Sequence, residues 1–128
     1  MKAGIVAAVL MALLSGCGGG GTGDSTPPPA PTGLYGAREY VDAVDTVKLW
    51  WAASNGAAKY KVYRSLGEGW NPIVVGETTN VRYTDITIPQ NPEYRALDAN
   101  YRVTAMSPSG TESALSNTCT LPLPPKPQ

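Results

Sequence analysis

The feature that most constrains the fold is a two-residue alternation of apolar and polar side chains, repeated in short runs. Because successive side chains of a strand point to opposite faces of a sheet, such runs predict half-buried strands of antiparallel sheets. Turn-forming residues at 54–56 and 107–110 separate neighbouring runs. The expected strands are 46–51, 59–63, 73–75 (ended by Gly76), 83–86, 101–105 and 115–121. With no amphipathic helix evident after residue 17, the fold class is expected to be all-β.

Composition narrows the possible functions. The chain has no histidine, and its 10 basic residues balance 10 acidic ones. Histidine is the usual general base and the commonest metal ligand. We therefore expect a non-enzymatic protein without a catalytic residue, a metal site or a cofactor. The balanced charge gives no reason to expect nucleic acid as a partner.

Residues 1–16 have the pattern of a signal peptide. Lys2 supplies a positive start, and residues 3–14 form an almost unbroken apolar run. That run fits the apolar core of a signal peptide, about 7–15 residues. It is short for a permanent membrane span, which needs about 20 residues. The alternatives are a buried N-terminal helix and a membrane anchor that is never cleaved.

The end of this run, Leu14-Ser15-Gly16-Cys17, resembles the lipobox of bacterial lipoproteins. The resemblance implies a diacylglyceryl group on the Cys17 thiol, cleavage between Gly16 and Cys17, and acylation of the new amine. Several acyl chains hold a protein firmly to a membrane. We therefore expect a lipid-anchored protein of the bacterial cell envelope. Because Gly18 and not Asp follows the cysteine, the same resemblance favours the outer membrane, if the host has one.

The rest of the chain divides into a tether, one domain and a tail. Residues 17–32 are rich in Gly and Pro and are expected to form a tether that does not fold alone. Residues 33–121 hold the strand pattern. Residues 122–128 form a Pro-rich tail, which either offers a polyproline ligand or prevents pairing at the sheet edge.

The order and spacing of the strand motifs resemble a fibronectin type III domain. The segments that carry the likeness are Pro31-Thr32-Gly33-Leu34, residues 46–51, Tyr60-Lys61-Val62-Tyr63-Arg64, Tyr83-Thr84-Asp85, residues 101–105 and Ser113-Ala114-Leu115-Ser116-Asn117. The resemblance implies an immunoglobulin-like antiparallel sandwich of about seven strands. Its expected core comprises Trp51, Tyr60, Val62, Tyr101 and Val103. It also implies a tyrosine-corner role for Tyr101, although the segment before this residue is longer than usual in the family.

Two groups of residues offer an alternative, enzymatic reading. If Cys17 carries lipid, Cys119 has no partner in the chain, and a lone thiol can pair with another chain or act as a nucleophile. Its place in an expected strand favours packing instead. Paired acids can hydrolyse glycosides or bind calcium, but a solvated acidic turn is the favoured interpretation of the cluster. The clustered acids are Glu39, Asp42 and Asp45.

Recognition is the favoured function, through one of two surfaces. Lys59, Lys61 and Tyr63 are expected on the outer face of one strand, and Arg102 and Thr104 on its neighbour. This face suits an anionic polysaccharide or an acidic protein, or is simply solvated. The second candidate is Trp70, in a Gly-rich and Asn-Pro-bounded loop, where it either contacts a sugar or protein partner or folds back on the sheet. Trp50, on an outer face, raises the same question.

We therefore predict a lipid-anchored envelope module for binding, adhesion or scaffolding, with a protein or polysaccharide partner. The alternative is a carbohydrate-binding accessory domain that uses exposed Trp and Tyr side chains.

Overall fold

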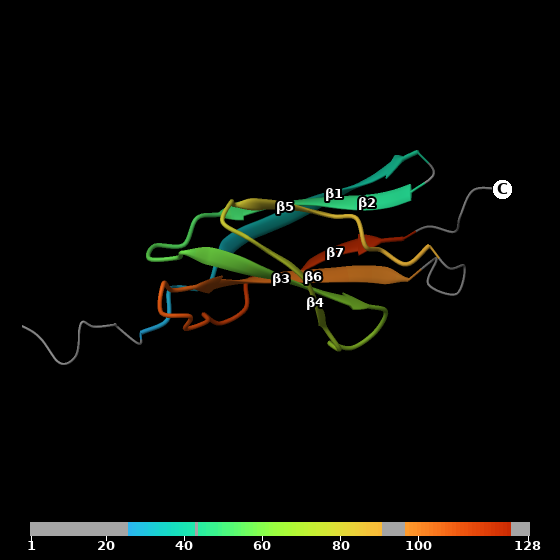
Figure 1. Cartoon of the computed structure of the whole chain (residues 1–128). Helices are drawn as coiled ribbons and strands as arrows, with labels where there is room; N and C mark the ends of the chain where they lie inside the picture. The colour runs from blue at the N-terminus through green and yellow to red at the C-terminus, as the bar shows by residue number, and fades with distance from the viewer. Residues whose placement is uncertain (1–25, 43, 91–96, 124–128) are drawn as a thin grey trace, which may run out of the picture.

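A computed structural model describes residues 26–42, 44–90 and 97–123 of the 128-residue chain. The described part contains seven strands and no helix (Figure 1). The strands are β1 (Thr32–Val41), β2 (Val44–Ala52), β3 (Lys59–Leu66), β4 (Ile73–Thr78), β5 (Arg82–Asp85), β6 (Asp98–Met106) and β7 (Cys119–Pro122).

The strands form two antiparallel sheets, one above the other in Figure 1. One sheet has three strands in the order β1-β2-β5, and the other has four in the order β4-β3-β6-β7. Every strand pair is antiparallel. The prediction of an all-β antiparallel sandwich is confirmed.

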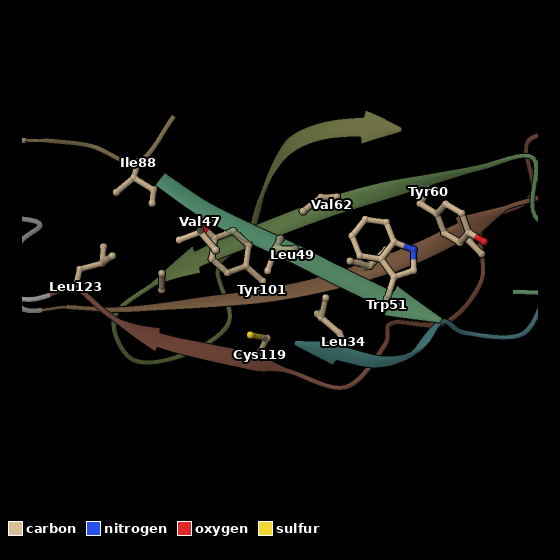
Figure 2. Packing of buried hydrophobic residues seen from close by; sticks show 13 residues of the cluster. Leu34, Val47, Leu49, Trp51, Tyr60, Val62, Ile88, Tyr101, Cys119 and Leu123 are labelled. Carbon is tan, nitrogen blue, oxygen red and sulfur yellow. The ribbon is translucent and has the colours of Figure 1, made fainter. Parts of the chain in front are cut away.

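The core lies between the sheets and is built by alternate residues of β2, β3 and β6. Burial alternates along β2, where Val47, Leu49 and Trp51 all face inward. Trp51 meets Tyr60 edge to face (Figure 2). Their ring centroids are 5.5 Å apart. The five residues expected in the core are all at most 5% exposed: Trp51, Tyr60, Val62, Tyr101 and Val103. A two-residue period therefore locates the inner faces of both sheets.

Strand β4 differs from the expectation, because it continues through Gly76 to Thr78. A Cβ at Gly76 would overlap the Tyr83 side chain. The Tyr83 hydroxyl donates a hydrogen bond to the Val75 carbonyl at 2.9 Å. The prediction that Gly76 ends the strand was wrong, because this glycine makes room for a tyrosine from the opposite sheet.

Strand β7 begins at Cys119, four residues later than expected. In the segment before it, two serine hydroxyls accept hydrogen bonds from backbone N–H groups of β6, as the carbonyls of a neighbouring strand would. Ser113 Oγ accepts from the Ala105 N–H and Ser116 Oγ accepts from the Val103 N–H, both at 2.9 Å. The segment therefore follows β6 without forming a regular ladder.

The folded domain also extends past its expected C-terminal boundary. Pro122 pairs with Asp98 at the end of β7. Leu123 is fully buried, and its N–H donates to the Leu97 carbonyl at 2.8 Å. The first two residues assigned to the tail are thus part of the sandwich.

At the other boundary, the end of the expected tether lies against the domain. Pro28 and Pro31 are buried, and the Ser54 hydroxyl donates a hydrogen bond to the Pro29 carbonyl. Ser54 N–H in turn donates to the Tyr60 hydroxyl at 3.0 Å. These prolines are therefore fixed to the turn between β2 and β3.

Candidate functional site

The anchor residues Gly16 and Cys17 lie outside the described residues, so cleavage and lipidation stay predictions. No helix in the described ranges is long and apolar enough to cross a membrane.

The register of β3 and β6 brings the predicted basic face together. Lys61 lies opposite Thr104, and Tyr63 lies opposite Arg102. The sequence therefore placed these residues on the correct neighbouring strands.

The lysines of that face are, however, paired with carboxylates. Lys59 Nζ lies 2.8 Å from Glu77 Oε1, and Lys61 Nζ lies 3.7 Å from Glu112 Oε1. The hydrogen bond from Lys59 lowers the pKa of Glu77. The face is thus nearly charge-balanced and has little to attract a polyanion.

Tyr63 and Thr104 are also occupied by Glu112. Both hydroxyls donate to Glu112 Oε2, Thr104 at 2.7 Å. Burial, together with the hydrogen bond to Glu112, raises the pKa of Tyr63 to about 12. Burial alone would raise the pKa of Glu112, but the hydrogen bonds from Tyr63 and Thr104 and the nearby Lys61 lower it overall. This cluster holds the loop after β6 to the sheet and leaves Tyr63 little freedom to contact a ligand.

Trp70 lies in the loop between β3 and β4, which hydrogen bonds hold in one shape. Gly67 and Gly69 adopt left-handed φ values of 78° and 80°, which glycine reaches without strain. Ser65 Oγ donates to the Gly69 carbonyl at 3.2 Å and accepts from the Asn71 N–H at 3.0 Å. These two hydrogen bonds hold the residues on either side of Trp70 in place.

A second set of bonds ties the same loop to β6. Asn100 Nδ2 donates to the carbonyls of Ser65 and Gly67, at 3.3 and 3.1 Å. The Gly67 N–H donates to the Asp98 carbonyl at 2.8 Å. Trp70 is thus positioned relative to the strand that carries Arg102.

Arg102 stacks over Trp70, with its guanidinium carbon 4.5 Å from the ring centroid. Arg102 Nε donates to Thr118 Oγ1 at 2.7 Å, which fixes the guanidinium plane. The structure therefore unites two residues that the sequence assigned to separate candidate surfaces. No pattern in the sequence pairs them, because the contact depends on how the loop folds back over β6.

Beside this pair is a hollow of roughly 520 Å³, a size usual for small-ligand sites. Its polar and aromatic lining comprises Glu68, Trp70, Asp98, Asn100, Arg102 and Thr118. The hollow offers an aromatic ring, a guanidinium and two carboxylates, which suits binding. We call these residues the Trp70–Arg102 hollow.

Trp50 belongs to a different surface. It stacks on Tyr35, with ring centroids 5.2 Å apart and an interplanar angle of 18°. Arg82 lies opposite it on β5, and Tyr35 is 60% exposed. This aromatic pair sits on the outer face of the three-stranded sheet, away from the Trp70–Arg102 hollow.

The residues of the enzymatic alternative do not converge. Cys119 is 9% exposed, and burial raises the pKa of its thiol, so the reactive thiolate is disfavoured. Asp45 is fully buried beside Arg38, with Oδ1 and Nη1 3.3 Å apart, and Glu39 pairs with Lys48 at 3.3 Å. The expectation of a solvated turn was therefore wrong for Asp45. Among the described residues, no group of three or more Cys, Asp or Glu side chains could hold a metal ion.

Sequence reasoning missed a buried ion pair. Arg64 Nη1 and the Tyr101 hydroxyl both donate to Asp85 Oδ2, at 2.8 and 2.7 Å. The inward positions of β3 are 60, 62 and 64, so the alternation itself places Arg64 in the core, where a charge needs a partner. The Tyr101 hydroxyl donates to this buried carboxylate. Because residues 91–96, which precede Tyr101, lie outside the described residues, its tyrosine-corner role stays a prediction.

Comparison with known sequences gives a partial match. No family model matches the chain. A poly(3-hydroxybutyrate) depolymerase from Delftia acidovorans is 36% identical over 89 residues, which cover 62% of this chain and 17% of the enzyme. The chain thus spans far less than two thirds of that relative.

Solved structures overlap it more completely. An Fn3-like protein from Clostridium thermocellum superposes with a TM-score of 0.61 and 29% identity, over 80% of this chain and 99% of that one. FN3tt superposes with a TM-score of 0.58 and 20% identity, over 76% and 95%. Together with the strand order, these matches define an immunoglobulin-like β-sandwich. Within that class the domain is fibronectin type III-like, as the sequence resemblance predicted.

Proposed function

We propose that the chain is an exported, lipid-anchored binding module of the bacterial envelope, without catalytic activity. The anchor rests on the Leu14–Cys17 motif. The binding role rests on one observation, the preformed contact between Trp70 and Arg102.

Trp and Arg are the side chains most often dominant in binding interfaces. Here both are already held before any ligand arrives, Trp70 by its bonded loop and Arg102 by Thr118. Ordering side chains is a main cost of association. A preformed pair avoids part of that cost, which supports a binding role for this surface.

The path of the chain suits display from an anchor. Pro29 is bound at the end of the sandwich that carries the β2–β3 turn. The β3–β4 loop, with Trp70, follows β3 at the other end, where β6 begins (Figure 1). In a module tethered through its N-terminal segment, the Trp70 loop would therefore lie at the end of the sandwich farther from the attachment.

A carbohydrate-binding accessory domain is the second candidate. The hollow has room for a sugar ring. The chain also resembles part of an enzyme named a poly(3-hydroxybutyrate) depolymerase, which favours binding to a polymer but not to a carbohydrate in particular. Accessory binding to a polymer is compatible with a non-catalytic sandwich.

The anchor is tested by the intact mass of the protein purified from membranes of its native host. We expect a chain beginning at Cys17 and carrying acyl chains, and we expect Cys17→Ser to leave the membrane fraction. A soluble, unmodified wild-type chain would refute the anchor.

The binding role is tested by sedimenting the purified mature protein with envelope preparations from the same host. Trp70→Ala should lose binding, whereas Trp50→Ala, which alters the other surface tryptophan, should retain it. Equal binding by both variants would refute the assignment of the Trp70 surface.

A further inference from the structure

The side-chain groups of the Trp70–Arg102 hollow that remain free to contact a ligand restrict the kind of ligand that it can bind. Asn100 has no donor left for a ligand, because its amide donates to the carbonyls of Ser65 and Gly67, and its Oδ1 accepts from Thr120 at 2.8 Å. Among the described residues, Arg102 donates only from Nε, to Thr118. A ligand therefore meets the Arg102 Nη groups, the Trp70 ring, and the carboxylates of Glu68 and Asp98.

The carboxylates disfavour an anion. Neither Glu68 nor Asp98 forms an ion pair with a described residue. Two carboxylates against one guanidinium give the lining a formal charge of −1. An anionic chain attracted to Arg102 would also meet two like charges.

The stacked guanidinium disfavours a cation. A tryptophan ring attracts a cation through its electron-rich face. Arg102 already occupies this position over Trp70, 4.5 Å from the centroid. A lysine or arginine of a partner peptide would therefore meet a ring that is already covered by a guanidinium of the same charge.

We propose that the hollow binds a neutral, hydroxyl-rich oligosaccharide, an inference that rests on the proposed binding function. Sugar hydroxyls donate to carboxylates such as those of Glu68 and Asp98, and they accept from the Arg102 Nη groups. The C–H face of a sugar ring packs on the exposed part of the Trp70 indole. A neutral sugar uses both signs of charge in the hollow and is repelled by neither.

The test is calorimetric titration of the mature protein with neutral oligosaccharides of glucose, galactose, mannose and xylose. Oligogalacturonate, oligolysine and poly(3-hydroxybutyrate) particles serve as anionic, cationic and donor-free comparisons. At least one neutral sugar should bind more tightly than all three. Trp70→Ala should weaken that binding at least about tenfold, and Trp50→Ala should leave it unchanged.

The carboxylates are tested separately with Glu68→Gln and Asp98→Asn, both at exposed positions. Each should weaken binding of the neutral sugar and strengthen binding of oligogalacturonate. Thermal unfolding of each variant verifies that the domain still folds.

Preference for oligogalacturonate, oligolysine or the polyester, or failure of every neutral sugar to bind, would overturn the proposed ligand class. If Trp70-dependent binding to whole envelopes persists in that case, the binding function stands and only the ligand is wrong. If that binding is also independent of Trp70, the proposed binding surface fails with it.

Discussion

At the residue scale, Asp85 shows how a charge is kept inside a small sandwich. The carboxylate is fully buried, which by itself would raise its pKa. Hydrogen bonds from Thr87, Tyr101 and Arg64 outweigh burial and lower the pKa below its usual value. The ionised form is therefore the one that the fold stabilises.

We expect Asp85→Asn to destabilise the domain by about 3–5 kcal/mol, because it leaves the buried Arg64 charge without its counterion. Urea unfolding measures the loss. The double variant Arg64→Met/Asp85→Asn should recover part of it, since the unpaired buried charge is removed while the asparagine oxygen still accepts from Tyr101. A loss below 1 kcal/mol in the single variant would show that the pair contributes little.

The lowered pKa of Asp85 also determines how the free energy of unfolding changes at acid pH. Its folded pKa lies below an unfolded value of about 3.9, so its contribution is complete above that pH and disappears as the pH falls through the folded pKa. Unfolding free energy should therefore fall more steeply below about pH 4 in the wild type than in Asp85→Asn. Equal slopes would contradict the assignment.

Gly76 is the other residue whose role depends on a single neighbour. Gly76→Ala should cost about 1–3 kcal/mol, because the added methyl overlaps the Tyr83 side chain in a packed core. Equilibrium unfolding of both single variants and of Gly76→Ala/Tyr83→Ala tests this. The alanine should cost much less once the ring is absent, and an unchanged cost would show that another contact requires the glycine.

At the element scale, the segment before β7 explains why strand ends were harder to predict than strand interiors. Apolar alternation follows from burial, so it located the inward residues of β2, β3 and β6. The end of β4 depends on Tyr83, and the start of β7 depends on Ser113 and Ser116, all through contacts between distant segments. The residue pattern within one segment carries no information about such long-range contacts, so it did not predict these strand ends.

Ser116→Ala tests the serine pairing. The buried Val103 N–H would lose its acceptor, at a cost of about 1–3 kcal/mol. Chemical unfolding, with amide hydrogen exchange at Val103, should show both the lower stability and faster local opening. Thr84→Ala, at an exposed position on β5, serves as the control and should change neither.

At the scale of the whole molecule, the sandwich and its sheet faces could be predicted, but the candidate site could not. Trp70 and Arg102 were each identified from sequence, one by its loop and one by its outward position. Their contact depends on two left-handed glycines and on the bonds of Ser65 and Asn100. The balance of charge on the neighbouring face depends in the same way on Glu112, which arrives from a loop.

The boundary at the N-terminus provides a prediction for the intact domain. A chain of residues 32–128 should be less stable than one of residues 26–128 by about 2–3 kcal/mol, because burial of Pro28 and Pro31 is lost. Thermal unfolding of the two chains measures the difference. Pro27→Ala, which changes an exposed proline, should have no effect, and equal melting of both chains would show that the segment only rests on the surface.

Pro29 and the loop that holds Trp70 lie at opposite ends of the sandwich, which has a mechanical consequence for the proposed module. A module anchored at one end and gripping a ligand at the other would bear tension along its strands. The ladder of β1 and β2 extends from the Thr32–Ala52 pair to the Val41–Val44 pair, with its hydrogen bonds across the direction of pull. Such a load shears many bonds at once and does not peel them one by one. If the proposed anchor and ligand load the two ends in this way, the sandwich would resist the drag of a bound ligand along its strands.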